Sequence, residues 1–206
     1  MTFLLLLFGT IGINTIAQAL SLPELQEKLA SQQLVRGQYI QTKKMRMFNQ
    51  PLLSRGDFVL QQKQGLLWLQ TQPFPVSLVL TQDKLSQQFD NQAPQIIQAQ
   101  DNPMVFYFSH LFLSLFKGDI AGLTAQFELH LQSVNEKSDK GQWLLLLTPK
   151  SAPLNKVFKQ LSISGAEYID QLELIELNDD SSTIQFINQN SLPTNLTDYE
   201  QHYFQF

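Results

Sequence analysis

Apolar and polar residues alternate with a period of two through most of the chain after Val35. Such alternation is typical of β-strands that bury one face and expose the other. Short polar connections, among them Lys63-Gln64-Gly65 and Gln82-Asp83-Lys84, separate neighbouring segments and indicate antiparallel hairpins. The expected strands cover residues 37–47, 56–62, 66–72, 76–82, 85–90, 125–131, 142–148, 160–164, 168–177 and 183–188. About ten to eleven strands of this kind form a sheet large enough to curl.

A helix is expected directly after Ser21. This serine and Glu24 form the Ser-x-x-Glu pattern of a capping box, and Pro23 fits a first helical turn. The apolar stripe of this helix consists of Leu22, Leu25 and Leu29. The stripe predicts that the helix packs against a large apolar surface.

A second helix is expected over residues 101–115, with Asn102 as its cap and Pro103 at its first position. The segment is apolar almost all round, so it should be buried or cover an apolar cavity. Gly118 and Gly122 are expected to break the chain behind it. Residues 199–206 are interpreted as a last strand, with contact to a membrane partner as the alternative. The expected fold class is therefore α+β, mainly antiparallel β.

The first 19 residues predict export. They carry no charged side chain, and an apolar run over residues 3–8 is too short to cross a bilayer of about 30 Å. The segment ends in Ala17-Gln18-Ala19, with small residues where a signal peptidase cuts. We expect a signal peptide at 1–19, cleaved after about Ala19, and a single periplasmic domain over 20–206. A buried N-terminal helix is the alternative.

Composition removes several classes of function. A net charge of −4 and a pI of about 5.3, without a basic cluster, argue against nucleic acid as a partner. The absence of cysteine excludes disulfides, a thiol nucleophile and sulfur-ligated metals. His110, His130 and His202 have no metal-binding spacing, and no nucleophile elbow, phosphate loop or dinucleotide motif is present. The sequence predicts no cofactor, no metal and no enzyme activity, although a lipid-modifying enzyme whose residues converge only in space stays open.

Several short motifs follow one another in order along the chain, from about Leu22 to about Asn190. They are Tyr39-Ile40-Gln41, Pro51-Leu52-Leu53-Ser54-Arg55-Gly56, Gly65-Leu66-Leu67-Trp68, Thr71-Gln72-Pro73, Leu147-Thr148-Pro149-Lys150, Ile163-Ser164-Gly165 and residues 180–186. In their joint order and spacing they resemble the outer-membrane lipoprotein carrier (LolA-like) family, as a divergent branch.

The resemblance implies a strongly curved half-barrel of antiparallel strands, with helices covering an apolar concave cavity. Members of the family receive lipoproteins from an inner-membrane complex, carry them across the periplasm and pass them to an outer-membrane acceptor. The implied partners are the acyl chains of a lipoprotein or another envelope lipid, an inner-membrane donor complex and an outer-membrane acceptor. The family shape also implies a monomer. A periplasmic module of the same fold that senses lipids or tethers an envelope complex is the alternative.

The expected cavity combines one face of two strands with the second helix. Side chains two apart on a strand share a face, and the resemblance places one such face on the concave side. Helical spacing adds four positions, of which the methionine offers adaptable surface. The predicted ligand-binding residues are Phe58, Leu60, Leu66, Trp68, Met104, Phe108, Phe112 and Leu115. The alternative is that these side chains simply fill a closed core.

Position 62 departs from the resemblance, which implies an arginine that restrains a helical lid. This chain has Gln62 there, and neutral hydrogen bonds are roughly half as strong as charge-assisted ones. Gln62 is therefore the predicted lid-gating position, and the cargo stays open between a lipoprotein and another long-chain lipid. Burial of about fifteen methylenes would be worth roughly 12 kcal/mol. Because a shuttle must release its cargo, we expect residues 102–115 to be mobile.

Overall fold

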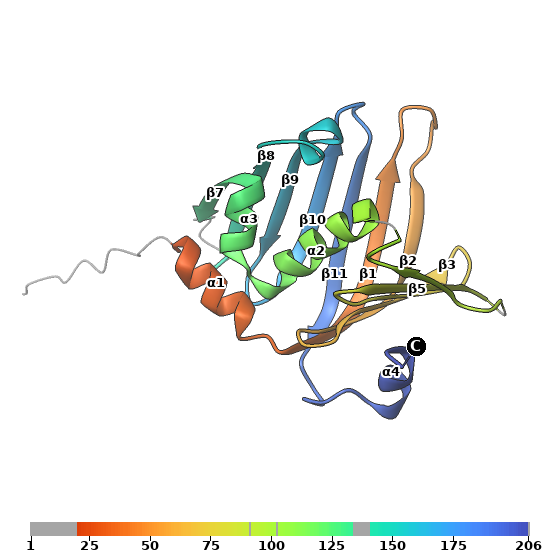
Figure 1. Ribbon diagram of the computed structural model, residues 1–206. Helices are drawn as coiled ribbons and strands as arrows, with labels where there is room; N and C mark the ends of the chain where they lie inside the picture. Colours follow the sequence, from red (N-terminus) through yellow and green to blue (C-terminus); the bar gives the residue numbers. More distant parts are fainter. Residues whose placement is uncertain (1–19, 91, 102, 134–140, 206) are drawn as a thin grey trace, which may run out of the picture.

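The computed structural model describes residues 20–90, 92–101, 103–133 and 141–205. Within these residues, eleven strands form one antiparallel sheet, accompanied by four α-helices and a short 3-10 helix (Figure 1). The elements in chain order are α1 (Leu22–Ala30), β1 (Leu34–Lys44), β2 (Leu52–Gln61), β3 (Gly65–Gln72), β4 (Val76–Leu80), β5 (Lys84–Phe89), β6 (Gln95–Gln98), α2 (Pro103–Lys117), α3 (Ile120–Gln126), β7 (Phe127–Ser133), β8 (Trp143–Pro149), η1 (Leu154–Lys156), β9 (Phe158–Gly165), β10 (Ile169–Glu176), β11 (Ser181–Asn190) and α4 (Asp198–Tyr203).

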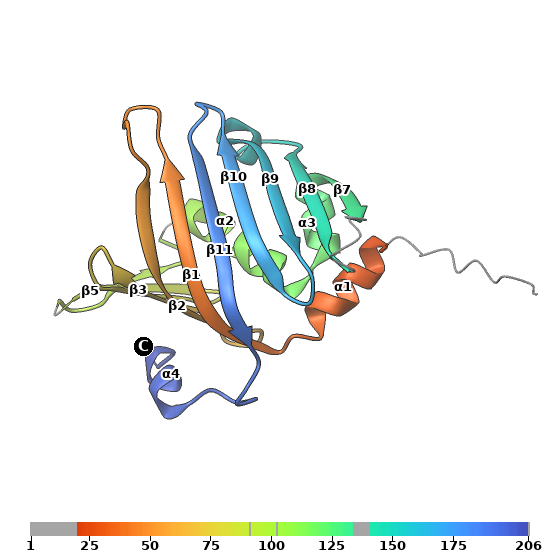
Figure 2. The same cartoon turned by 180° about the vertical axis from the view of Figure 1, so that it is seen from behind.

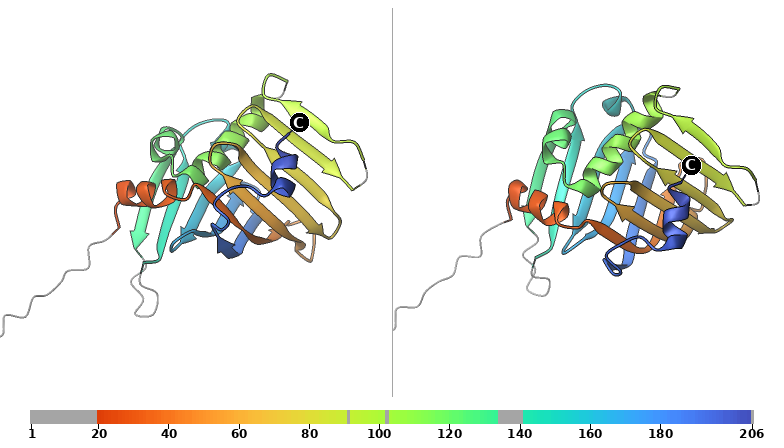
Figure 3. Two further views of the ribbon diagram at one scale, coloured as in Figure 1. Left: turned by 90° about the horizontal axis from the view of Figure 1, so that it is seen from below. Right: turned by 60° about the horizontal axis from the view of Figure 1, so that its bottom comes forward.

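The sheet consists of two meanders joined along β1 and β11. The strand order is β6-β5-β4-β3-β2-β1-β11-β10-β9-β8-β7, so β6 and β7 are its two edges and the sheet stays open. Figures 1 and 2 show its strong curvature, with β3 and β5 turned away from the direction of β8–β11. Helices α1, α2 and α3 lie on the concave side, whereas α4 lies outside β2 and β3 (Figure 3). The predicted half-barrel with covering helices is confirmed.

Local signals explain the start of α1 and the end of α2. The Ser21 backbone N–H donates to Glu24 Oε2 at 2.7 Å, and the Glu24 N–H donates to Ser21 Oγ at 3.4 Å, which confirms the capping box. Gly118 follows α2 with a φ of 63°, a region that favours glycine. A Cβ at this position would lie 2.9 Å from Leu29 Cβ, so the glycine also lets α2 approach α1 closely. Asn102, the predicted cap of α2, lies outside the described residues.

The segment after α2 differs from the sequence prediction. Gly122 does not break the chain, because it lies inside α3 and its N–H donates to the capping carboxylate of Asp119 at 3.0 Å. Helix α3 therefore takes up residues 125 and 126 of the predicted strand, and β7 begins at Phe127. The four-residue edge strand β6 is also absent from the predicted set.

The predicted C-terminal strand is wrong, because Asp198–Tyr203 form helix α4. Thr197 and Glu200 make a second capping box, with the Thr197 N–H donating to Glu200 Oε2 at 2.7 Å and the Glu200 N–H donating to Thr197 Oγ1 at 3.2 Å. The C-terminal segment covers a small apolar cluster on the outer face of the sheet. That cluster consists of Val59, Leu67 and Val79, packed against Leu69, Leu196, Tyr203 and Phe204.

A partly buried ion pair fastens this segment to the sheet. Arg36 on β1 donates to both carboxylate oxygens of Glu200, at 2.5 and 2.8 Å, and to the backbone carbonyls of Pro193 and Asn195. Burial acts to raise the pKa of Glu200, but the hydrogen bonds and charge of Arg36, with the N–H of Thr197, outweigh it and lower the pKa. The pair is therefore ionised at neutral pH, and it joins β1 to α4.

Candidate functional site

An apolar pocket of about 310 Å³ lies between α2 and the concave face of the sheet. None of its eight lining residues is charged, and seven of them are apolar. Strands β3, β4, β5 and β11 contribute most of the wall, and α2 contributes two residues. The lining residues are Leu66, Trp68, Leu78, Leu80, Leu85, Ser109, Phe112 and Ile184.

Strand register explains why this wall is apolar. Leu66 pairs with Leu80, and Leu80 pairs with Leu85, so one row of leucines crosses three strands. Trp68 and Leu78 form the neighbouring pair on the same face, two residues along. Cross-strand neighbours on one face pack directly together. The pocket floor is therefore a continuous apolar surface made by β3, β4 and β5.

Aromatic rings continue this surface into the core. Trp68 stacks on Tyr39 with ring centroids 3.7 Å apart. Phe186 on β11 makes edge contacts with Phe116 of α2 at 5.4 Å and with Phe58 of β2 at 5.1 Å. Offset and edge-to-face arrangements of this kind are the favourable ones for aromatic pairs. The rings thus connect α2 with β1, β2, β3 and β11.

The structure distributes the eight predicted ligand-binding residues unevenly. Leu66, Trp68 and Phe112 line the pocket. Phe58, Leu60 and Leu115 lie beside them in the same apolar cluster, but they are only 1–3% exposed and pack against other side chains. The remaining two, Met104 and Phe108, belong to α2, and their side chains lie outside the described residues. A role in binding ligand stays a prediction for the whole set.

Several pocket residues are missing from the predicted set. The alternation that selects Leu66 and Trp68 on β3 continues on the next two strands of the meander. There it selects Leu78, Leu80 and Leu85. Ile184 reaches the pocket from β11, which lies far along the sequence from β3, β4, β5 and α2. Local pattern could have indicated the three leucines, whereas the isoleucine depends on the long-range curvature of the sheet.

Gln62 lies directly after β2, at the C-terminal end of α1. Its side-chain amide donates to the backbone carbonyl of Ala30 at 3.1 Å and, at 3.4 Å, to that of Leu29. Its side-chain oxygen accepts a hydrogen bond from Gln33 at 3.4 Å. These contacts satisfy terminal carbonyls of α1. An effect of Gln62 on α2 stays a prediction.

Two polar contacts hold α2 in place over the sheet. Tyr107 donates from its hydroxyl to Gln126 Oε1 of α3 at 2.6 Å. The His110 ring bonds through Nε2 to the backbone carbonyl of Gln82, in the connection between β4 and β5. His110 is exposed, and no group of three or more metal-ligating side chains occurs among the described residues. These contacts attach α2 to α3 and to the β4–β5 connection.

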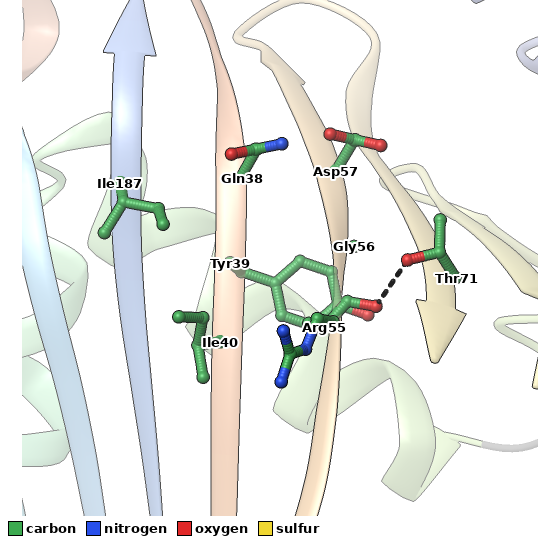
Figure 4. Close-up of a pocket in the computed structure, with 8 residues that line it drawn as sticks. All are labelled: Gln38, Tyr39, Ile40, Arg55, Gly56, Asp57, Thr71 and Ile187. Atoms are coloured by element: carbon green, nitrogen blue, oxygen red, sulfur yellow. Dashed lines mark hydrogen bonds between the residues drawn. The ribbon is translucent and has the colours of Figure 1, made fainter. Parts of the chain in front are cut away.

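A second depression, of about 230 Å³, lies on the outer face across β11, β1, β2 and β3 (Figure 4). Gln38, Arg55 and Asp57 give it a polar lining. The Thr71 hydroxyl donates to the backbone carbonyl of Arg55 at 3.1 Å, as Figure 4 shows. A polar lining of this kind does not favour an apolar ligand, so the apolar pocket beneath α2 is the candidate site.

The fold and the pocket define a class of protein, the open half-barrel whose helices enclose an apolar space. The model of one family, described as outer membrane lipoprotein carrier protein LolA, matches residues 30–201. The chain therefore belongs to the LolA family, and the predicted membership, as a divergent branch, is confirmed. Proteins of this family are periplasmic and act as carriers rather than enzymes. Among the described residues, no helix has the length and apolar character needed to span a membrane.

Solved structures with a similar fold share little sequence with this chain. A LolA superfamily protein from Nitrosomonas europaea is 11% identical, with a TM-score of 0.44 and coverage of 88% of this chain and 100% of that one. The MucA/MucB complex of Pseudomonas aeruginosa contains a chain that is 15% identical, with a TM-score of 0.48 and coverage of 82% and 56%. A lipoprotein-sorting protein domain from Vibrio parahaemolyticus is 8% identical, with a TM-score of 0.48 and coverage of 89% and 96%. No curated protein matches the chain.

Proposed function

We propose that residues 20–206 form a periplasmic carrier for the acyl chains of a lipoprotein or another long-chain envelope lipid. The uncharged pocket beneath α2 carries this proposal. Each methylene group gains about 0.8 kcal/mol when it leaves water for such a surface. Membership of the LolA family supports passage of the cargo from an inner-membrane donor to an outer-membrane acceptor. The absence of charged side chains from residues 1–19, with an apolar run over residues 3–8, supports export.

The size of the pocket bears on the mechanism. Its volume of about 310 Å³ lies at the lower end of the roughly 300–1,000 Å³ typical of ligand pockets. A long acyl chain therefore needs a wider space, and α2 is the element that can move to provide it. Opening α2 separates its own apolar contacts, and this cost offsets part of the roughly 12 kcal/mol that about fifteen buried methylenes would contribute. The net affinity is then moderate, and release becomes possible.

The predicted residues have two roles in this mechanism. Leu66, Trp68 and Phe112 contact the acyl chain in the existing pocket. The deeper residues, together with the α2 positions 104 and 108, contact it as the pocket widens. No catalytic group takes part, because the proposed carrier binds and releases its cargo unchanged.

Replacing Leu78 by glutamate tests the proposal. Leu78 is half-buried in the pocket wall, and a carboxylate there would have to lose its hydration beside an acyl chain. The protein is purified, extracted with organic solvent, and the extract is analysed by mass spectrometry. We expect the unmodified chain to retain acyl lipid and Leu78→Glu to retain at least about tenfold less.

The matched control is Ile96→Glu on β6. Register places Ile96 on the same face as Val79, the outer face of the same half of the sheet, and its side chain is 48% exposed. Circular dichroism checks that both variants fold. Equal lipid retention in the two variants would contradict the proposed site. Lipid-free unmodified protein that also fails to take up added acyl lipid would favour a module of the same fold without a carrier role.

A further inference from the structure

Three connections lie together at one end of the sheet. They are the β1–β2 hairpin loop, the β10–β11 turn, and the segment formed by η1 with the start of β9. The Arg46 N–H donates to Asp180 Oδ1 at 2.8 Å, and the Leu177 N–H donates to the carbonyl of Val157 at 2.9 Å, so the three are hydrogen-bonded side by side. Figures 1 and 2 show them at the end of the sheet away from α4.

This end carries an unusual share of exposed apolar side chains. Among the described residues, six of the eleven large hydrophobic side chains that are exposed belong to these connections and the adjoining start of β2. They are Met47 (75% exposed), Phe48 (49%), Leu52 (51%), Leu53 (53%), Val157 (37%) and Leu177 (49%). We name these six residues the tip surface. Leu52 and Leu53 are consecutive on β2 and point to opposite faces, so the tip surface extends around this end of the sheet. Exposed apolar groups that gather at one end of a molecule mark an interaction site more often than single ones do.

Cationic side chains accompany the tip surface. Five of them lie in these connections or in the adjoining ends of β1 and β9, namely Lys43, Lys44, Arg46, Lys156 and Lys159. Three anionic ones accompany them, Glu176, Asp179 and Asp180. Glu176 pairs with Lys43 at 3.8 Å, Asp179 pairs with Lys159, and Asp180 is buried. This end therefore has two positive charges in excess, although the whole chain has a net charge of −4.

We propose that the tip surface docks on the anionic phospholipid surface of a bilayer. Met47 and Phe48 are at the turn of a hairpin, so they can enter the headgroup region without unfolding any strand. Lys44 and Arg46 directly precede them and would meet lipid phosphates, while their aliphatic stems lie along apolar groups. Apolar insertion combined with attraction to anionic headgroups is the physical basis of binding at a membrane interface. The charge complementarity selects an anionic bilayer as the partner over a neutral one.

The absence of cysteine from the chain makes a direct test possible. Met47→Cys, labelled with an environment-sensitive fluorophore, reports on the tip surface in the full-length protein. We expect its emission to rise and shift to shorter wavelength with phosphatidylglycerol-containing vesicles, and to change little with pure phosphatidylcholine vesicles. Raising the salt concentration should weaken the response, because exposed charges are screened. Neutralising Lys44 or Lys156 with glutamine should weaken binding about fivefold each.

Leu192→Cys with the same label is the matched control, since Leu192 is 70% exposed beyond the opposite end of β11. A response from both labels, an equal response to neutral vesicles, or no response to either vesicle would overturn the proposal. The double variant Met47→Ser/Phe48→Ser should lose vesicle binding and still take up acyl lipid in the pocket. Leu78→Glu should show the opposite result, with acyl uptake lost and vesicle binding kept. The two variants therefore separate the carrier function from membrane docking.

Discussion

Tyr39 is a polar residue at the centre of an apolar wall. It is fully buried and it stacks on Trp68, and its hydroxyl makes no hydrogen bond of standard geometry with the described residues, although the neighbouring Trp68 side chain acts to lower its pKa. Burial raises the pKa of Tyr39 to about 12, so the phenol stays neutral at physiological pH. A buried hydroxyl without a partner costs about 1–3 kcal/mol. Removing it with Tyr39→Phe should therefore raise the free energy of unfolding by about 1 kcal/mol.

Urea denaturation of the unmodified chain and Tyr39→Phe measures this difference. Tyr107→Phe is the comparison, because its hydroxyl donates to Gln126 and its removal should lower stability by about 1 kcal/mol. If Tyr39→Phe lowered the stability as well, the Tyr39 hydroxyl would have to be hydrogen-bonded in the folded protein.

The Arg36–Glu200 pair gives stability a pH dependence. The pKa of Glu200 in the folded protein lies below its ordinary value of 4.5. Stabilisation from the carboxylate is thus fully present above about pH 4.5 and is lost as the pH falls through the lower, folded-state pKa.

Glu200→Gln should lower the free energy of unfolding by about 2 kcal/mol at pH 7, and this loss should shrink as the pH falls into the acid range. Asp198→Asn, an exposed change of the same charge in α4, should show a much smaller deficit at pH 7. Equal deficits would contradict a specific role for the pair.

At this scale, strand parity predicted part of the candidate site and missed part of it. The alternation in β3 correctly placed Leu66 and Trp68 on one face, because side chains on a strand alternate whatever the surroundings. It could not separate residues that line an empty space from those that fill the core, such as Phe58 and Leu60. That difference depends on how far α2 stands from the sheet, which no local pattern records.

At the scale of elements, α2 combines an apolar composition with two polar attachments, from Tyr107 to α3 and from His110 to the β4–β5 connection. A helix that opens should show faster amide exchange than the central strands, and bound acyl chain should change its protection. Hydrogen exchange measured by mass spectrometry, with and without a long-chain fatty acid, tests this over Pro103–Lys117 against β1. Protection equal to that of β1 in both states would rule out the movement of α2.

The C-terminal helix α4 is an element that the sequence prediction missed. Thr197 and Glu200 form the same Thr/Ser-x-x-Glu signal that correctly predicted α1 from Ser21 and Glu24. The alternation of side chains over residues 199–206 suggested a strand instead. In the structure, Tyr203 and Phe204 lie at the end of one short helix and pack against the apolar cluster on the outer face of the sheet. For α3, the sequence prediction took Gly122 as a break in the chain, but Asp119 caps a helix that contains this glycine. Glycine is tolerated inside a helix at a cost of about 1 kcal/mol.

At the scale of the whole molecule, the order of the expected strands along the chain predicted most of the sheet topology. Short hairpins fix the antiparallel neighbours of each meander, and family resemblance supplied the curvature. The pairing of β1 with β11 joins residues about 150 apart, such as Gln38 and Ile187, and no local signal specifies it. This pairing carries Phe186 and Ile184 to the pocket side of β1. The shape of the pocket is therefore a property of the complete sheet.

The central claim, that acyl chains occupy the pocket beneath α2, is tested most directly by tryptophan fluorescence. The chain has two tryptophans, Trp68 in the pocket wall and Trp143, which is fully buried in β8. Trp143→Phe leaves Trp68 as the only tryptophan, and Trp68→Phe leaves Trp143. A brominated long-chain fatty acid, which quenches only on close contact, should quench Trp68 strongly and Trp143 weakly, and the unbrominated acid should quench neither. Unchanged Trp68 emission in the presence of bound brominated acid would contradict the claim.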